Sequence, residues 1–91
     1  MMIRAHVTIQ GQVQGVFFRA YTQEKARELG VSGWVGNNSD GTVTVAAEGP
    51  ENVVKQLIEW CHSGPSRAQV KKVDVTFETY TGEFEDFEIR Y

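Results

Sequence analysis

The sequence contains very little of several residue types on which whole classes of function depend. Its one cysteine, Cys61, excludes an internal disulfide and a cysteine-rich zinc site. Its two histidines, His6 and His62, are far apart and have no cysteine or carboxylate at metal-ligand spacing, so we expect neither a metal site nor a cofactor. Basic residues number 9 against 12 acidic ones, and the net charge of -3 argues against a nucleic-acid partner.

Long apolar runs are also missing. No stretch approaches the ~20 residues that span a bilayer, so no membrane association is expected. The chain begins Met1-Met2-Ile3-Arg4, without the apolar segment of a secretory signal. We therefore expect a cytoplasmic protein, in a compartment where thiols stay reduced.

The residues that are present are those of an ordinary globular domain. Hydrophobic residues make up 41% and charged residues 23% of the 91 positions. This length predicts a single domain over residues 1–91 with one modest core, and a monomer is the default for this size.

Hydrophobic periodicity predicts an alternation of strands and helices. Strands, where apolar and polar residues alternate, are expected at residues 3–9, 32–37, 42–47, 73–77 and 87–91. Helices, where apolar residues fall on one face, are expected at about residues 18–29 and from Pro50 to the break at Gly64-Pro65. Asp40-Gly41 marks a hairpin turn.

This order predicts an α+β fold, specifically an α/β sandwich of the ferredoxin-like βαββαβ type. Because the strands alternate, we expect an antiparallel sheet of four to five strands with both helices packed on one face. Unrelated functions share this fold, so the function must be sought in a site.

The most informative stretch links the first strand to the first helix. It reads Gly11-Gln12-Val13-Gln14-Gly15-Val16-Phe17-Phe18-Arg19. Glycines let successive N–H groups converge into an anion-binding nest, and the free N–H groups at a helix start favour the same ligand. An arginine beside them supplies a planar fork that matches phosphate oxygens. The simpler interpretation, a flexible connection followed by a surface arginine, is favoured when spacing alone is considered.

Further motifs give this stretch a specific resemblance. They are Gly33-Trp34-Val35-x-Asn37, Asp40-Gly41-Thr42-Val43, Gly49-Pro50 and the closing Ile89-Arg90-Tyr91. Together with the Gly11–Arg19 stretch they resemble the acylphosphatase family, in order and spacing, over essentially the whole chain. The resemblance implies metal-free hydrolysis of the carboxyl–phosphate bond of acyl phosphates. Inorganic phosphate would then be both product and inhibitor.

The resemblance also implies roles for particular residues. Arg19 would be catalytic as the phosphate-binding arginine, and Asn37 would be catalytic by orienting the attacking water. The phosphate cradle would comprise Gly11, Gln12, Val13, Gln14, Gly15, Val16 and Phe17, with Arg19. For Asn37 the residues alone favour a turn-forming role, because Asx side chains bond their own backbone.

Three other functions are compatible with the fold. An RNA-binding domain of the same strand order needs aromatic residues on its first and third strands, and residues 42–47 contain none. A regulatory module would bind an anion in the same loop without hydrolysing it. A domain of a larger carbamoyl-transfer protein could retain Arg19 and Asn37. The physiological acyl phosphate is not identified by the sequence.

Overall fold

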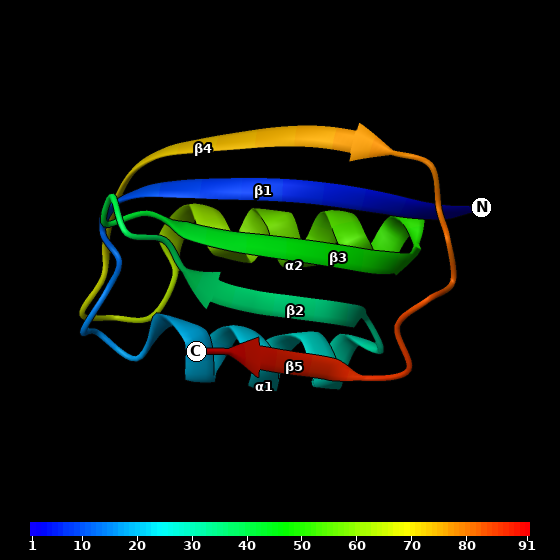
Figure 1. The fold of residues 1–91 in the computed structure, drawn as a ribbon, viewed down its shortest axis with the longest axis horizontal. Helices are drawn as coiled ribbons and strands as arrows, with labels where there is room; N and C mark the ends of the chain where they lie inside the picture. The colour runs from blue at the N-terminus through cyan, green and yellow to red at the C-terminus, as the bar shows by residue number, and fades with distance from the viewer.

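A computed structural model describes all 91 residues, which form five strands and two helices (Figure 1). In chain order the elements are β1 (Met2–Gln12), α1 (Phe18–Leu29), β2 (Ser32–Asn37), β3 (Val43–Pro50), α2 (Glu51–Ser63), β4 (Gln69–Glu78) and β5 (Phe87–Arg90). The expected βαββαβ order with one further strand is confirmed.

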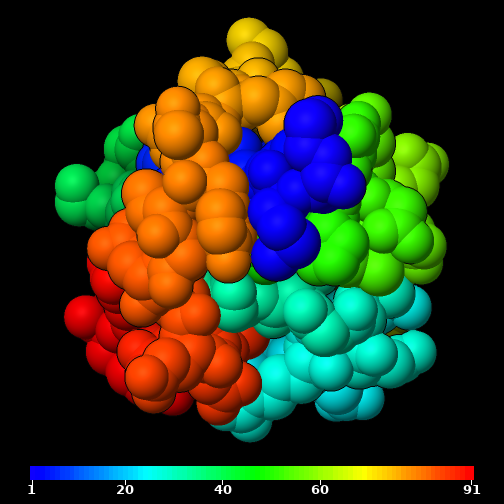
Figure 2. All heavy atoms as spheres, turned by 90° about the vertical axis from the view of Figure 1, so that its right-hand side faces the viewer, coloured from blue at the N-terminus to red at the C-terminus, as the bar shows by residue number.

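The five strands form one sheet in the order β4-β1-β3-β2-β5. The pairings β1–β3, β1–β4 and β2–β3 are antiparallel, as expected, whereas β5 runs parallel to β2. The sheet is therefore mixed. The parallel pairing arises because residues 79–86 carry the chain from the β4 edge across one end of the sheet to the opposite edge (Figures 1 and 2).

Both helices cover the same face of the sheet, and the core lies between them and the strands (Figure 1). The odd-numbered residues of β1, Ala5, Val7 and Ile9, are fully buried, as the alternation predicts. From α2 the predicted stripe contributes Leu57 and Cys61. Each large apolar side chain buried in this way stabilises the fold by roughly 1.5–3 kcal/mol. Burial also raises the pKa of the Cys61 thiol to about 12.

Several element boundaries differ from those expected. β1 continues to Gln12, so the first two residues of the predicted loop belong to a strand. Helix α2 begins at Glu51, with Pro50 as its N-cap residue instead of its first helical residue. The fixed φ of proline suits either position, and here Pro50 still pairs with Met2 at the end of β3.

A buried carboxylate, Glu48 in β3, fixes the connection that leads to β5. It accepts hydrogen bonds from the Thr81 N–H at 2.8 Å, the Thr81 hydroxyl at 2.9 Å and the Gly82 N–H at 3.1 Å. The Arg4 guanidinium lies 3.3 Å away. Burial by itself would raise the pKa of Glu48, but the hydrogen bonds from Thr81 and the charge of Arg4 outweigh it and hold that pKa below its usual range.

Candidate active site

A cavity of about 260 Å³ opens at the end of the sheet where β1 passes into α1. Three segments line it: the β1–α1 loop with the first turn of α1, the end of β2, and the end of the chain. The lining residues are Val13, Gly15, Phe17, Phe18, Arg19, Ala20, Asn37, Ile89 and Tyr91. The cavity thus brings together the two predicted catalytic residues, Arg19 and Asn37, with part of the predicted cradle.

Strand periodicity explains why these segments face one another. Asn37 follows the buried Val35 by two residues, so both side chains lie on the helix-covered side of the sheet. Val35 pairs with Ile89 of β5, and Tyr91 follows Ile89 by two residues. Asn37, Ile89 and Tyr91 are therefore directed to the side on which α1 begins.

The backbone of the loop offers unused hydrogen-bond donors. The N–H groups of residues 13–17 donate to no acceptor within the chain. The first residues of α1 add further N–H groups that lack an intrahelical acceptor. Gly15 and Phe17 both have positive φ angles, 73° and 64°, which turn the chain sharply just before the helix. Positive φ angles of this kind allow successive N–H groups to point into one concave nest, the geometry that binds an anion.

Gln14 ties the loop to the β2–β3 hairpin. Its side-chain amide donates to the carbonyl oxygen of Asn38 at 2.8 Å and to that of Thr42 at 2.9 Å. Both side-chain N–H groups are thereby engaged, so Gln14 positions the loop through its side chain and has only its backbone N–H for a ligand.

Four residues of the predicted cradle do not line the cavity: Gly11, Gln12, Gln14 and Val16. Gly11 and Gln12 pair with Val70 and Gln69 of β4. Gly11 has a φ of 133°, and a Cβ there would collide with the carbonyl oxygen of Gln69. Its glycine is thus explained by the close approach of β4.

Arg19 lies one residue inside α1 and is half-buried. It makes no ion pair with any carboxylate, and its Cζ lies 5.0 Å from the centroid of the Tyr91 ring. Such a cation–π contact orients the guanidinium plane while leaving its N–H groups available. The charge of Arg19 is therefore held at the cavity without being neutralised.

Two roles were considered for Asn37, forming the turn and orienting a water. The contacts of its neighbour Asn38 bear on the first. Asn38 donates from its side chain to the hydroxyls of Thr42 at 2.9 Å and Thr44 at 2.7 Å. Asp40 accepts from the Thr42 N–H at 3.0 Å, and the hydrogen bonds from Thr42 lower the pKa of Asp40. The turn is held by these residues, whereas the Asn37 side chain makes no hydrogen bond within the chain and borders the cavity.

Sequence reasoning assigned no site role to four of the lining residues: Phe18, Ala20, Ile89 and Tyr91. Phe18 and Ala20 flank Arg19, so their adjacency to a predicted site residue was an available signal. Ile89 and Tyr91 are distant in sequence, and only the parallel pairing of β5 with β2 brings them to the cavity. The closing Ile89-Arg90-Tyr91 motif was the one local sign.

The cavity lining includes no histidine, cysteine, aspartate or glutamate. Nowhere in the chain do three or more such side chains gather in an arrangement that could hold a metal ion. His62 lies on α2, where its Nδ1 is 3.0 Å from the Ile58 carbonyl oxygen. Neither helix is long and apolar enough to cross a membrane.

Comparisons with known proteins agree with one another. The acylphosphatase family model matches residues 5–89. A curated acylphosphatase from Geobacter sulfurreducens is 55% identical over 91 residues, which is all of both chains. The crystal structure of an acylphosphatase from Bacillus subtilis superposes with a TM-score of 0.94 at 34% identity, again over the whole of both chains. Full-length HypF contains a similar region, 28% identical with a TM-score of 0.90, which is 12% of that protein.

These matches cover the elements that build the cavity, from β1 through β5. The match to the family model extends over more than half of the chain, and the Geobacter sulfurreducens relative is 55% identical along its full length. The chain therefore belongs to the acylphosphatase family, and its activity is that family's hydrolysis of an acyl phosphate to a carboxylate and inorganic phosphate.

Proposed function

We propose that the cavity is the active site and that Arg19, Asn37 and the backbone of residues 13–17 carry the reaction. The observation that carries this proposal is the convergence of free N–H groups, an unneutralised guanidinium and an unbonded amide on one cavity. The phosphoryl group lies in the nest, and Arg19 binds two of its oxygens. Ile89 and Tyr91 border the space on the β5 side.

Hydrolysis then needs only a positioned water. The Asn37 amide holds a water in line with the leaving carboxylate, and its oxygen attacks phosphorus as the bond to the acyl oxygen breaks. The bonding electrons leave with the carboxylate, and both water protons end on the phosphate, giving a carboxylate and dihydrogen phosphate. No side chain of the lining is a carboxylate or an imidazole, so we assign the first proton transfer to a phosphoryl oxygen.

Electrostatic stabilisation supplies most of the rate enhancement in this scheme. In phosphoryl transfer, negative charge is spread over the equatorial oxygens in the transition state. Preorganised N–H groups and a guanidinium stabilise that charge without further rearrangement. Because these donors supply the positive charge, the mechanism uses no metal ion.

The two adjacent asparagines provide a matched test. Asn37→Ala removes the water-orienting amide, so kcat should fall about 10²-fold or more while the affinity for phosphate and the thermal midpoint stay nearly unchanged. Asn38→Ala removes two hydrogen bonds of the turn and should lower stability by about 1–3 kcal/mol, with kcat per folded molecule nearly intact.

The assay is hydrolysis of benzoyl phosphate in excess chelator, with a phosphomonoester as control. Loss of activity on chelation, restored by a divalent ion, would contradict the metal-free mechanism. An Asn37→Ala enzyme with native kcat and a lowered midpoint would assign Asn37 to the turn.

Binding of RNA on the open sheet face receives no support from the side chains there. On that face β1 presents Arg4, His6, Thr8 and Gln10, and β3 presents Thr44, Ala46 and Glu48, none of which is aromatic. Trp34 of β2 is covered by the Arg90 guanidinium, whose Cζ lies 4.2 Å from the ring centroid. We propose a cytoplasmic monomer that acts on a small acyl phosphate, and sedimentation at assay concentrations tests the monomeric state.

A further inference from the structure

The basic side chains fall into two groups according to their partners. Of the nine, five form ion pairs with carboxylates: Arg4, Lys25, Arg27, Lys55 and Lys72. The remaining four, Arg19, Arg67, Lys71 and Arg90, have no carboxylate within ion-pair distance. Arg19 belongs to the proposed active site, and Arg90 stacks on Trp34. Arg67 and Lys71 are exposed and have no partner at all.

Both of these unpartnered cations are on segments that pack against the two ends of the β1–α1 loop, one at Phe18 and the other at Gly11. Arg67 belongs to the connection between α2 and β4. That connection is pressed against the first residue of α1, because a Cβ at Gly64 would lie 2.5 Å from Cε2 of the Phe18 ring. Lys71 lies at the start of β4, where the neighbouring Val70 pairs with Gly11 at the end of β1.

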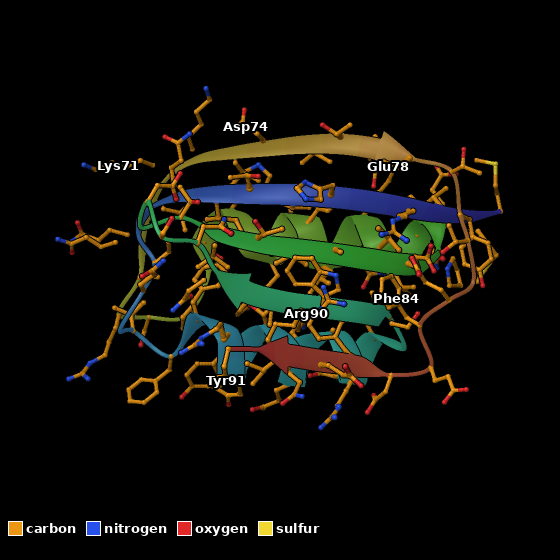
Figure 3. All side chains as sticks on the ribbon, viewed as in Figure 1. Lys71, Asp74, Glu78, Phe84, Arg90 and Tyr91 are labelled. Atoms are coloured by element: carbon orange, nitrogen blue, oxygen red, sulfur yellow. The ribbon has the colours of Figure 1, made fainter.

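A β-bulge sets the direction of Lys71. Between the pairs Lys72–Gln10 and Val70–Gly11, β4 advances two residues while β1 advances one, so Lys71 is the extra residue. A bulge re-aims side chains and increases the local twist. Accordingly Val70 packs against the core and Lys71 projects from the cradle end of the molecule (Figure 3).

Acidic side chains gather at the other end of the molecule. Lys71 and Glu78 lie at opposite ends of β4, and the connection that follows Glu78 is acidic (Figure 3). Its carboxylates are Glu83, Glu85 and Asp86. This acidic connection and Lys71 therefore lie toward opposite ends of the 32 Å long axis. At the cavity end the carboxylates are Asp40 of the β2–β3 turn and the carboxyl terminus at Tyr91.

We propose that Arg67 and Lys71 form a basic rim that attracts the anionic acyl phosphate to the cradle and raises its occupancy there. The rim rests on the proposed function of the cavity and extends it, because it acts on the total charge of the substrate instead of on the transferred phosphoryl group. Charged clefts raise the local concentration of ions of opposite sign in this way. Acyl phosphates whose acyl group carries a further carboxylate benefit most.

The test removes one rim charge at a time. Arg67→Gln and Lys71→Gln are compared with Lys55→Gln, which changes the net charge equally but lies near the start of α2, paired with Glu51. A single charge about 10 Å from a phosphate dianion changes its occupancy roughly two- to fourfold in water. Each rim variant should raise KM, and the Kd of inorganic phosphate measured by calorimetry, by that factor at low ionic strength.

The effect should fade by about 0.5 M salt, where the Debye length falls to only a few ångströms. The kcat and the thermal midpoint should stay unchanged, and Lys55→Gln should behave as the unmodified enzyme. In both rim variants the KM for succinyl phosphate should rise more than the KM for acetyl phosphate.

Three results would overturn the rim. In the first, Arg67→Gln and Lys71→Gln remain active and change neither KM nor the Kd of phosphate. That result would leave the proposed function standing. In the second, Lys55→Gln raises KM and the phosphate Kd as much as the rim variants do. The effect would then come from net charge and not from the position of the rim. If no variant binds phosphate at all, the cavity itself is not an anion site and both proposals fail.

Discussion

At the scale of single residues, the proposed site depends on keeping polar groups free of internal partners. Arg19 has no carboxylate partner, and the Asn37 amide has no hydrogen bond within the chain, although both have polar neighbours. The neighbours are bonded elsewhere: Asn38 bonds within the hairpin and Gln14 bonds to it. The hydrogen bonds made by Gln14 and Asn38 thus leave Arg19 and Asn37, the proposed functional residues, without partners.

Arg19 and Arg90 each stack on an aromatic ring, so the same substitution can be compared at both positions. Arg19→Lys keeps the charge but loses the planar fork that stacks on Tyr91 and that we propose binds two phosphate oxygens. We expect kcat to fall on the order of 10²–10³-fold and phosphate affinity to weaken. Arg90→Lys loses an equivalent stack, on Trp34, but lies outside the cavity.

Steady-state kinetics on benzoyl phosphate, with phosphate inhibition, separates these effects. Arg90→Lys should be nearly as active as the unmodified enzyme. If Arg19→Lys folds well and keeps near-native kinetics, bidentate binding is ruled out.

At the scale of elements, the loop between β1 and α1 needs a backbone conformation that disfavours side chains. Gly15 has a φ of 73°, with open space around the position of a Cβ, so Gly15→Ala introduces strain without a clash. We expect a stability loss of about 1 kcal/mol and weaker phosphate binding. Gly41, in the β2–β3 turn, has a φ of 92° and is equally open.

Gly41→Ala is therefore the control, with a similar stability loss and unchanged phosphate affinity. Urea denaturation and calorimetry on the two variants provide the comparison. Equal phosphate affinity in both would remove Gly15 from the cradle.

The connection between β4 and β5 gives a prediction about pH. Because the pKa of Glu48 is lowered in the folded state, its contribution to stability is present above the unfolded pKa of about 4.3 and is lost as the pH falls through the folded value. Glu48→Gln leaves Arg4 without its buried partner and should cost about 3 kcal/mol at pH 7.

The stability gap between Glu48→Gln and the unmodified protein should narrow below about pH 4. Comparing the two proteins isolates Glu48 from Asp40 and Asp86, whose pKa values are also lowered by their hydrogen-bond partners. Urea denaturation at pH 7 and pH 3 measures the gap. A gap that stays constant would contradict the assignment.

Hydrophobic periodicity predicts the strands where the alternation is unbroken. It fails where a β-bulge or a close backbone contact interrupts the alternation. β1 and β3 were evident from alternation. β4 was expected only from residue 73, because the bulge at Lys71 breaks the alternation between Val70 and Val73. The family resemblance implies that Gly11 belongs to the cradle, and only the contact with β4 shows that this position requires glycine for a different reason.

The residues that line the cavity could be predicted in part. Family resemblance predicts Arg19 and Asn37, since neither residue carries a strong signal of its own, and their catalytic roles stay a prediction. Tyr91 and Ile89 were not assigned, because their place depends on which strand β5 pairs with. That choice follows from the path of residues 79–86, which no local pattern encodes.

At the scale of the whole molecule, the phosphate site should couple to global stability. A ligand that binds only the folded state stabilises it by RT ln(1 + [L]/Kd), or about 2.7 kcal/mol at 100 times Kd. For a domain of this size, that corresponds to a rise in thermal midpoint of roughly 10–20 °C. Differential scanning calorimetry in phosphate, against chloride at equal ionic strength, measures it.

Arg19→Ala should show a much smaller rise under the same conditions. No rise in the unmodified protein at saturating phosphate would argue against the cradle. A rise that Arg19→Ala retains in full would place the bound phosphate elsewhere on the molecule.

The position of β1 between β3 and β4 has a consequence for biosynthesis. β1 is translated early, and one of its edges pairs with β3. Its other edge is paired only when β4 has been made. At roughly 5–20 residues per second, about 3–13 s pass between the synthesis of Gln12 and that of Glu78. Throughout that interval the nascent chain exposes an apolar strand to chaperones and to other chains. Ile89 and Tyr91 are translated later still, so a ribosome stalled before β5 holds a cradle that lacks its facing wall.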